Sequence, residues 1–356
     1  MIKTLSPYFI TTPFVSPATA LTCQNYTIHL YIWNGLKASV PATAFYEETV
    51  ENPEGLTGDS KISIARLLAD FIELTPIQDT GTGYVDADAA WWVKKDITYL
   101  TTDPTDGTTP QLAETLLFGR GYAYGNEGEN QATNANKVLL NIVDYKVNRE
   151  GVFSVPVLTD EVSVSPITVI SYPDNEINFS GSIIATTDSG KLVRNVWVDL
   201  SETTTDTYVE VVFNSVTVTL LIQDEYKYTP MDIFFINKEG FQQSMTFFKE
   251  KNTGLTVSNS QFESNYGQPL DGFHQFKEYN IQGRTDLSLN SGWIDEEMNE
   301  ILTQLLLSDM VWSFADGVFT PLNRKTKNLK YKSRVQDRLI NYEISFEDSY
   351  NKINNI

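Results

Sequence analysis

The chain has 356 residues, which exceeds the usual length of one domain, so we expect two or three domains. Hydrophobic residues make up 41% of the chain and charged residues 20%, which excludes a disordered chain and a coiled coil. The 26 Lys and Arg residues stand against 46 Asp and Glu residues, a formal net charge of −20, and so acidic a surface repels nucleic acids and anionic membrane surfaces.

The N-terminal segment does not look like a leader peptide. Pro7, Pro13 and Pro17 interrupt its apolar runs, whereas a signal peptide needs a continuous apolar core. No stretch approaches the roughly 20 apolar residues that a membrane span requires. Cys23 is the only cysteine, so no disulfide can form within the chain. We therefore expect a protein that is made and assembled in the cytoplasm.

Residue alternation predicts a strand first at Asn25–Trp33, where apolar side chains recur every second residue. Both faces of this strand carry apolar groups, so we expect one face on a core and the other against a neighbouring domain or subunit. In Ile62–Glu73 the apolar residues are spaced by three and one, which predicts a short helix that Pro76 prevents from continuing. This helix is expected to dock on a sheet.

Most of the remaining elements are predicted to be strands. Runs of β-branched and aromatic residues predict them at Trp91–Leu100, Lys137–Tyr145, Val162–Tyr172, Val193–Leu200, Tyr208–Phe213, Val216–Ile222 and Met231–Ile236. Only Asn214 and Ser215 separate two of these strands, which predicts a tight hairpin because Asn tolerates a positive φ. A second helix is predicted over Ile294–Asp309, with the acidic residues 295–297 in its first turn.

The predicted fold is mainly β, with two or more β-sandwich or barrel-like domains and a few short docking helices. A Pro-flanked acidic segment, Pro156–Pro166, divides a β-rich N-terminal domain (residues 1–158) from a mixed β domain (residues 159–356) that contains the helix near residues 294–309. Long polar loops are expected in the first domain and at the start of the second, where a protein often meets its partners. They are Gln78–Asp88, Thr101–Pro110, Gly119–Asn136 and Ser201–Thr207.

No motif predicts catalysis. The two histidines, His29 and His274, lie outside any zinc-protease motif, and no nucleophile elbow, phosphate loop or dinucleotide fingerprint occurs. Asp86 and Asp88 favour a solvated loop edge, with a cation site as the alternative. We therefore predict no catalytic residue, no metal and no cofactor, and a protein that is not an enzyme.

Aromatic residues suggest a different kind of site. In the segment GRGYAYG (residues 119–125), Tyr122 and Tyr124 share one face of an extended chain, which suits either packing or stacking on a sugar, and we favour packing. The alternative is a module that binds a host receptor or a surface glycan. The rings available to it in the N-terminal part are Tyr84, Trp91, Trp92, Tyr122 and Tyr124.

One basic segment stands out from the acidic chain. We call it the basic row, and it consists of Arg324, Lys325, Lys327, Lys330, Lys332, Arg334 and Arg338. Within it, Leu329–Val335 alternates basic and less polar residues, which predicts a half-buried strand with a cationic outer face. A nucleic-acid contact is one interpretation. We favour an interface with an acidic neighbour, because copies of this chain offer much acidic surface.

Several segments in the C-terminal third carry a family likeness. They are Tyr228–Lys251, Gln275–Asp309 and Thr320–Ile356, with the motifs Asn237-Lys238-Glu239-Gly240, Ser291-Gly292-Trp293-Ile294-Asp295-Glu296 and Pro321-Leu322-Asn323. With the N-terminal MIKTLSPYFITTPF and the segment ENPEGLTGDSKISIARLLADFI, they resemble virion structural proteins of tailed phages that infect Bacteroidetes-type, flavobacterial hosts. The resemblance implies a tail or baseplate subunit, packed in a ring with copies of itself and with other tail proteins. It implies no catalytic residue.

The sequence therefore supports three hypotheses in order. The first is a structural subunit of a virion tail, near its distal end, that acts through contacts between subunits. The second is the receptor- or carbohydrate-binding module. The third is a polysaccharide-cleaving enzyme with paired carboxylates, for which no convincing pair is found.

Overall fold

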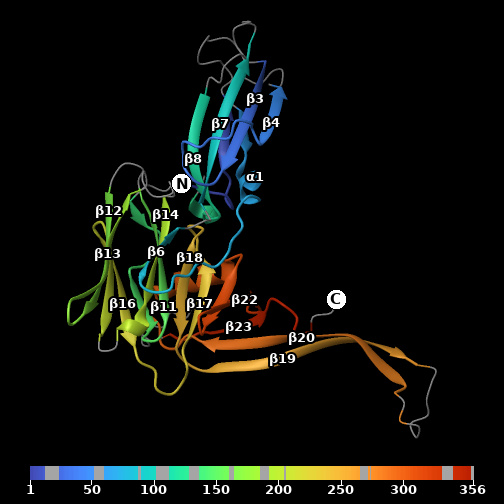
Figure 1. Cartoon of the computed structure of the whole chain (residues 1–356). Coiled ribbons are helices and arrows are strands. Elements are labelled where there is room, and N and C mark those ends of the chain that lie inside the picture. Colours follow the sequence, from blue (N-terminus) through green and yellow to red (C-terminus); the bar gives the residue numbers. More distant parts are fainter. Residues whose placement is uncertain are drawn as a thin grey trace.

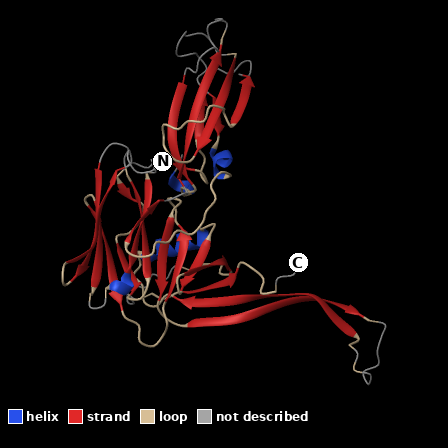
Figure 2. Cartoon of the chain, in the orientation of Figure 1, coloured by secondary structure: helices blue, strands red, loops and turns tan. Residues whose placement is uncertain are grey.

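The computed structural model describes residues 1–12, 24–51, 60–86, 90–101, 112–127, 136–159, 164–184, 192–203, 206–264, 272, 274–330 and 340–353. These residues form several β-sheets and two short helices, so the prediction of a mainly β fold is confirmed. Figure 1 shows an upper lobe, a broader lower body and a long hairpin that projects from the body. Strands dominate all three parts (Figure 2). Within the described ranges, no helix has the length and apolar character that a bilayer span would need.

The upper lobe is built on a five-stranded sheet. Its strands, in spatial order, are β1 (Ile2–Lys3), β8 (Leu112–Gly119), β7 (Ala90–Leu100), β3 (Asn25–Trp33) and β4 (Tyr46–Glu51). Burial along most of β3 alternates, as its sequence predicted, and the buried residues join the core of the lobe. The strands β2 (Phe9–Thr12) and β5 (Ser60–Ser63) form a separate pair. Because residues 60–63 are extended in this pair, helix α1 (Ala65–Ala69) is shorter than predicted.

The left side of the body consists of two sheets that share one apolar core. One sheet contains β10 (Asp144–Asn148), β16 (Val216–Gln223), β15 (Tyr208–Phe213), β12 (Val164–Tyr172) and β13 (Glu176–Ile184). The other contains β6 (Gly83–Asp86), β14 (Val193–Asp199), β11 (Val152–Leu158) and β9 (Lys137–Val138). The predicted hairpin is confirmed as β15–β16, and Asn214 adopts a φ of 54°.

Two predictions about this region were wrong. The expected strand Lys137–Tyr145 is interrupted, because β9 ends at Val138 and β10 begins only at Asp144. The expected loop Gln78–Asp88 contains β6, which pairs with β14. Both errors have the same cause, because pairing with a strand distant in sequence, and not the local residue pattern, decides where a short segment becomes a strand.

The right side of the body is a seven-stranded sheet. It contains β18 (Gln242–Phe247), β17 (Met231–Ile236), β21 (Val311–Ala315), β22 (Val318–Arg324), β23 (Glu343–Asp348), β20 (Phe276–Asn290) and β19 (Lys251–Glu263). Helix α2 (Met298–Leu307) packs on the body and starts later than predicted, because Ile294 forms a β-bridge with Ile340. The acidic residues 295–297 therefore precede the helix instead of forming its first turn. Short 3₁₀ turns occur at Gly125–Glu127 and Leu200–Glu202.

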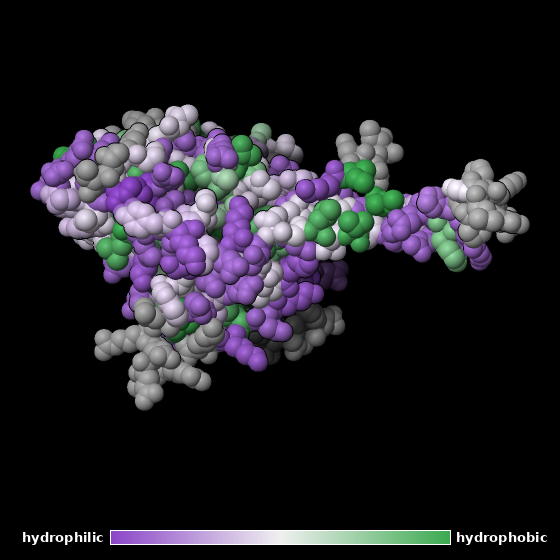
Figure 3. Space-filling view, turned by 90° about the horizontal axis from the view of Figure 1, so that it is seen from below, coloured by the Kyte–Doolittle hydropathy of each residue, from purple (hydrophilic) through white to green (hydrophobic). Residues whose placement is uncertain are grey.

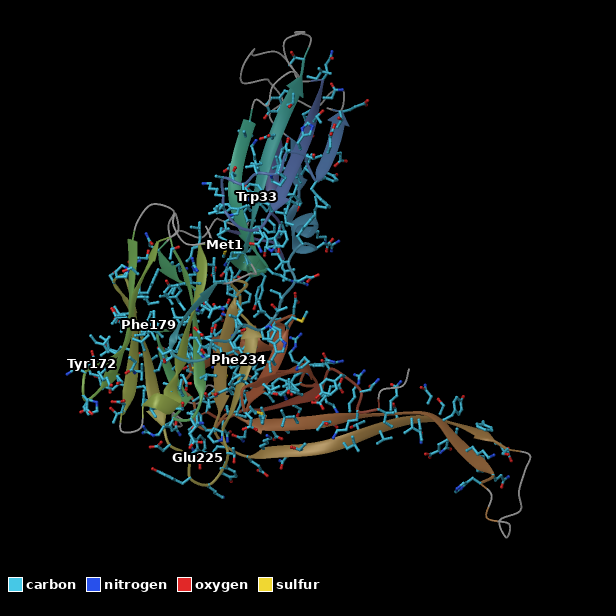
Figure 4. All side chains as sticks on the ribbon, viewed as in Figure 1. Met1, Trp33, Tyr172, Phe179, Glu225 and Phe234 are labelled. Atoms are coloured by element: carbon cyan, nitrogen blue, oxygen red, sulfur yellow. The ribbon has the colours of Figure 1, made fainter. Side chains whose placement is uncertain are left out.

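The upper lobe meets the body at a tight junction, where Figure 4 places Met1. The backbones of Gly121 and Gly240 approach so closely that a Cβ on Gly240 would lie 2.4 Å from the Gly121 nitrogen. Gly240 has a φ of 94°, which also favours glycine. A buried ion pair joins Lys3 to Glu239 at 2.9 Å across the same junction. Residues of the predicted N-terminal domain thus contact the turn that follows β17.

The predicted domain boundary at residues 158 and 159 stays a prediction. Strands β11 and β14 lie on either side of it and pair along their whole length. Strand β11 is buried throughout, because it lies between the apolar core of the two left-hand sheets and the seven-stranded sheet.

Candidate assembly surface

The most exposed regular structure in the described part of the chain is the hairpin of β19 and β20, which we call the arm. The two strands pair antiparallel from Lys251 and Leu289 to Glu263 and Phe276. Only residues 286–290 of β20 also pair with β23, so most of the arm is a two-stranded ribbon. At about 3.4 Å per residue, the 13 residues of β19 span roughly 44 Å. Figure 1 shows this ribbon extending far beyond the body.

A β-bulge divides the arm into an inner and an outer part. Ser258 pairs with Gln282, but Ser260 pairs with Tyr279, so β20 has one residue more than β19 between these pairs. Asn280 adopts a φ of 51° there. A bulge bends a ribbon and increases its twist. The outer part therefore points in a different direction from the inner part.

One face of the inner arm carries exposed apolar side chains. Leu255 is 58% exposed, Val257 55% and Ile281 38%. A Cβ on Gly283 would lie 3.3 Å from a Leu255 methyl and 4.0 Å from a Val257 methyl, so both side chains lie over this glycine. Further along the same face of β20, Leu287 is buried in the body core. The apolar face of the arm thus continues the core surface into solvent.

The opposite face of the inner arm is polar and held by the C-terminal part of the chain. Asp286 accepts hydrogen bonds from Thr256 and, at 2.9 Å, from Lys325, which lower the pKa of its carboxyl. Arg284 forms an ion pair with Glu347 at 3.1 Å. The two faces of the inner arm therefore differ, because one is covered by intramolecular polar contacts and the other is open.

The outer arm carries aromatic side chains and a lysine. Phe262 pairs with Lys277, and the rings of Phe262 and Tyr279 meet edge to face with 5.7 Å between their centroids. Because residues two apart in a strand share a face, Lys277 and Tyr279 lie on the same face as Phe262. All three are exposed, and so is Phe276 on the other face. Figure 4 shows side chains projecting from both sides of the arm, and Figure 3 shows hydrophobic patches on it.

The two strands of the arm carry no net charge, in contrast to the chain as a whole. They contain the cations Lys251, Lys277 and Arg284 and the anions Glu263, Glu278 and Asp286, a balance of zero. The complete chain carries −20. Two copies of this protein repel each other through their acidic surfaces, and the arm is a surface that can approach another copy without that repulsion.

The described part of the basic row does not form a continuous cationic face. Arg324 is half-buried at the end of β22, and burial lowers the pKa of its guanidinium, with Asp309 acting in the opposite direction. Lys325, Lys327 and Lys330 are all exposed, and Lys325 forms an ion pair with Asp286 on the arm. Neither Leu329 nor Lys330 is in a strand, so the predicted strand does not begin at Leu329. The row's remaining members, Lys332, Arg334 and Arg338, lie outside the described residues, as does Asp88 of the predicted loop edge.

The tyrosines of the GRGYAYG segment lie at the junction between upper lobe and body. The Tyr122 nitrogen donates to the Lys238 carbonyl at 2.8 Å, and the Tyr124 hydroxyl donates to Glu300 on α2 at 2.7 Å. Lys238 also lies over the Tyr124 ring, 4.4 Å from its centroid. Burial raises the pKa of Tyr122 to about 12, and it also raises the pKa of Tyr124. These contacts hold both tyrosines against the body, and their role in glycan contact stays a prediction.

The other aromatic residues proposed for glycan contact are also packed. Trp92 is only 3% exposed, and its indole donates to the Gly35 carbonyl at 3.0 Å, so its ring offers no free face to a sugar. Trp91 packs against Phe71 with 6.2 Å between the ring centroids. The Tyr84 ring meets Phe179 edge to face at 5.8 Å.

A large polar hollow of about 960 Å³ lies at the lower edge of the body. Asp232 contributes to its lining, and burial raises the pKa of this carboxyl to about 6. Asp232 accepts hydrogen bonds from Thr246 at 2.6 Å and from the Val152 nitrogen at 3.2 Å. These bonds tie β17 to β18 and β11, which is a structural role. In the ranges that the structure describes, no group of three or more His, Cys, Asp or Glu residues is placed to hold a metal ion.

Sequence reasoning missed the arm. Its strands alternate Thr, Ser and Asn with few apolar residues, so they lack the apolar runs by which the other strands were found. The available signal was the length of the alternating pattern, in which Leu255 and Val257 occupy one face. No protein family matches the chain, and no curated protein is similar enough to count as a relative.

Proposed function

We propose that this protein is a non-enzymatic structural subunit that assembles with copies of itself, and that its place is a tail or baseplate ring near the distal end of a phage tail. In this proposal the protein is assembled in the host cytoplasm and resides in the virion. The position in a virion is supported by the family resemblance of the sequence. The assembly role is supported by one observation, the exposed arm.

The arm supports assembly because a two-stranded hairpin with apolar side chains in water is only marginally stable on its own. Covering Leu255, Val257 and Ile281 with another subunit removes apolar surface from water, which is the main favourable term in most protein association. A ribbon about 44 Å long and two strands wide presents about 400 Å² on each face. The open face alone supplies about half of the roughly 800 Å² per partner of a standard interface, so surface outside the inner arm has to contribute the rest.

The proposal is tested by sedimentation velocity of the purified chain over a hundredfold range of concentration, together with negative-stain microscopy for rings. We expect association to increase with concentration. We also expect it to be stronger at high salt, because salt screens the repulsion between copies that each carry −20. A chain that stays monomeric at every concentration and salt, also with its neighbouring tail proteins present, would contradict the proposal.

A further inference from the structure

A second apolar surface lies on the body, beside the base of the arm. It is a hollow of about 260 Å³ between β10, β16 and the segment that leads into α2. Phe248, Ile294 and Met298 are buried residues that line it. Leu221 is an exposed lining residue, and the nearby Trp293 is exposed too. A cavity of about 150 Å³ is known to hold a benzene molecule, so this hollow is large enough for an aromatic ring.

The rim of the hollow is acidic. Asp144, Asp295 and Glu297 are exposed lining residues, and Lys146 is the one basic residue among the described residues that line it. The Lys146 ammonium lies 3.1 Å from the Asp295 carboxylate. Three carboxylates against one ammonium leave the rim with an excess of negative charge. The hollow therefore suits a partner that combines an apolar or aromatic group with a cation.

The outer arm has that combination. Phe262 and Tyr279 form an aromatic pair, and Lys277 lies on the same face, directly opposite Phe262 in the ribbon. Aromatic residues that enter apolar pockets are the commonest energetic centres of protein interfaces. The matching charges add specificity, because a lysine on the arm meets carboxylates on the rim.

We infer that the outer arm of one copy inserts its Phe262–Tyr279 pair into this hollow on the next copy, with Lys277 facing the acidic rim. This inference rests on the proposed function and adds the pair of surfaces that meet. Phe262 and the hollow lie at opposite ends of the arm, so the contact joins two different surfaces. Such a head-to-tail contact generates closed rings or open filaments instead of a symmetric dimer.

The experiment uses two full-length variants that each lack one half of the contact. The arm variant is Phe262→Ser with Tyr279→Ser, and the hollow variant is Leu221→Arg, which adds bulk and positive charge at an exposed strand position. Val318→Arg is the matched control, since Val318 is also exposed on a strand but does not line the hollow. Sedimentation velocity measures assembly. We expect each half-variant to weaken self-association by about 30-fold and the control to leave it unchanged.

Mixing the two variants gives the decisive result. Each variant retains the half that the other lacks, so the mixture should form one-to-one dimers that cannot extend further. A charge swap supplies a second readout, in which Lys277→Glu weakens assembly and Lys277→Glu combined with Glu297→Lys restores it.

Three outcomes would overturn the inference. If the hollow variant assembles like the unmodified chain while the arm variant does not, the arm has a different docking site and the proposed function stands. If the mixed variants form no dimers, the two surfaces do not meet. If the unmodified chain never associates, both the inference and the proposed function fail.

Discussion

The apolar face of the inner arm gives the sharpest quantitative prediction. We consider the triple variant Leu255→Thr, Val257→Thr and Ile281→Thr, because Thr is polar and its β-branched side chain is favoured in strands. The exposed fractions of the three residues together correspond to about one and a half complete side chains. Full burial of such a side chain contributes about 1.5–3 kcal/mol, so covering this face contributes about 2–4 kcal/mol to association. At about 1.4 kcal/mol per factor of ten, the dissociation constant should rise by roughly 30- to 1000-fold.

The measurement is the concentration dependence of sedimentation for the unmodified chain and the triple variant. The matched control is Ile177→Thr with Val318→Thr, because these residues are also exposed on strands but lie outside the arm. Thermal unfolding should be nearly the same for all three proteins, since exposed substitutions change stability little. Equal association of the triple variant and the unmodified chain would show that the arm face stays open in the assembly, and the reasoning from exposed apolar area would be refuted.

Three further predictions concern the body and its junction with the upper lobe. Because burial raises the pKa of Asp232 to about 6 from 3.8, the folded chain keeps a proton between these pH values that the unfolded chain has lost, and its stability falls as pH rises. Asp232→Asn removes this effect. Between pH 4 and 7, the free energy of unfolding of the variant, measured with denaturant, should therefore rise by about 3 kcal/mol relative to that of the unmodified chain. Parallel curves of stability against pH would contradict this prediction. Gly240→Ala should lower the free energy of unfolding by about 2–5 kcal/mol, because Gly240 has a positive φ and its backbone contacts that of Gly121. The control is Gly35→Ala, which has a φ of 105° but open space around it and should lose only the smaller, conformational part of this free energy. Equal losses in the two variants would refute the close approach. Glu239→Gln should lower the free energy of unfolding in urea by about 3 kcal/mol, because it removes the carboxylate that pairs with the buried Lys3 ammonium. An unchanged urea midpoint would show that this ion pair does not stabilise the junction.

Local sequence rules predicted those elements whose signal is contained in the element itself. Strand β3 was predicted with both ends, because one face repeats apolar residues every second position. The β15–β16 hairpin followed from one Asn in a two-residue link. The helices were predicted too long, because Ile294 and Ser63 belong to extended segments whose partners, Ile340 and Phe9, are far away in sequence.

The candidate site depended much more on tertiary structure. Composition identified aromatic residues as contact groups, but it could not distinguish the buried Trp92 from the exposed Phe262, because burial depends on which strands cover a face. The same holds for Lys325, which the sequence assigned to the basic row of a predicted interface and which contacts Asp286 on the arm.

The sequence by itself determined that the chain is strand-rich and acidic, because alternation and charge are properties of neighbouring residues and of the total composition. Only the tertiary structure decided which strands form the core and which leave it as the arm. The physical reason is that β19 and β20 pair with each other by the same hydrogen bonds as any other strands. What differs is that, in the described part of the chain, their apolar side chains Leu255 and Val257 stay exposed, and no local pattern records this.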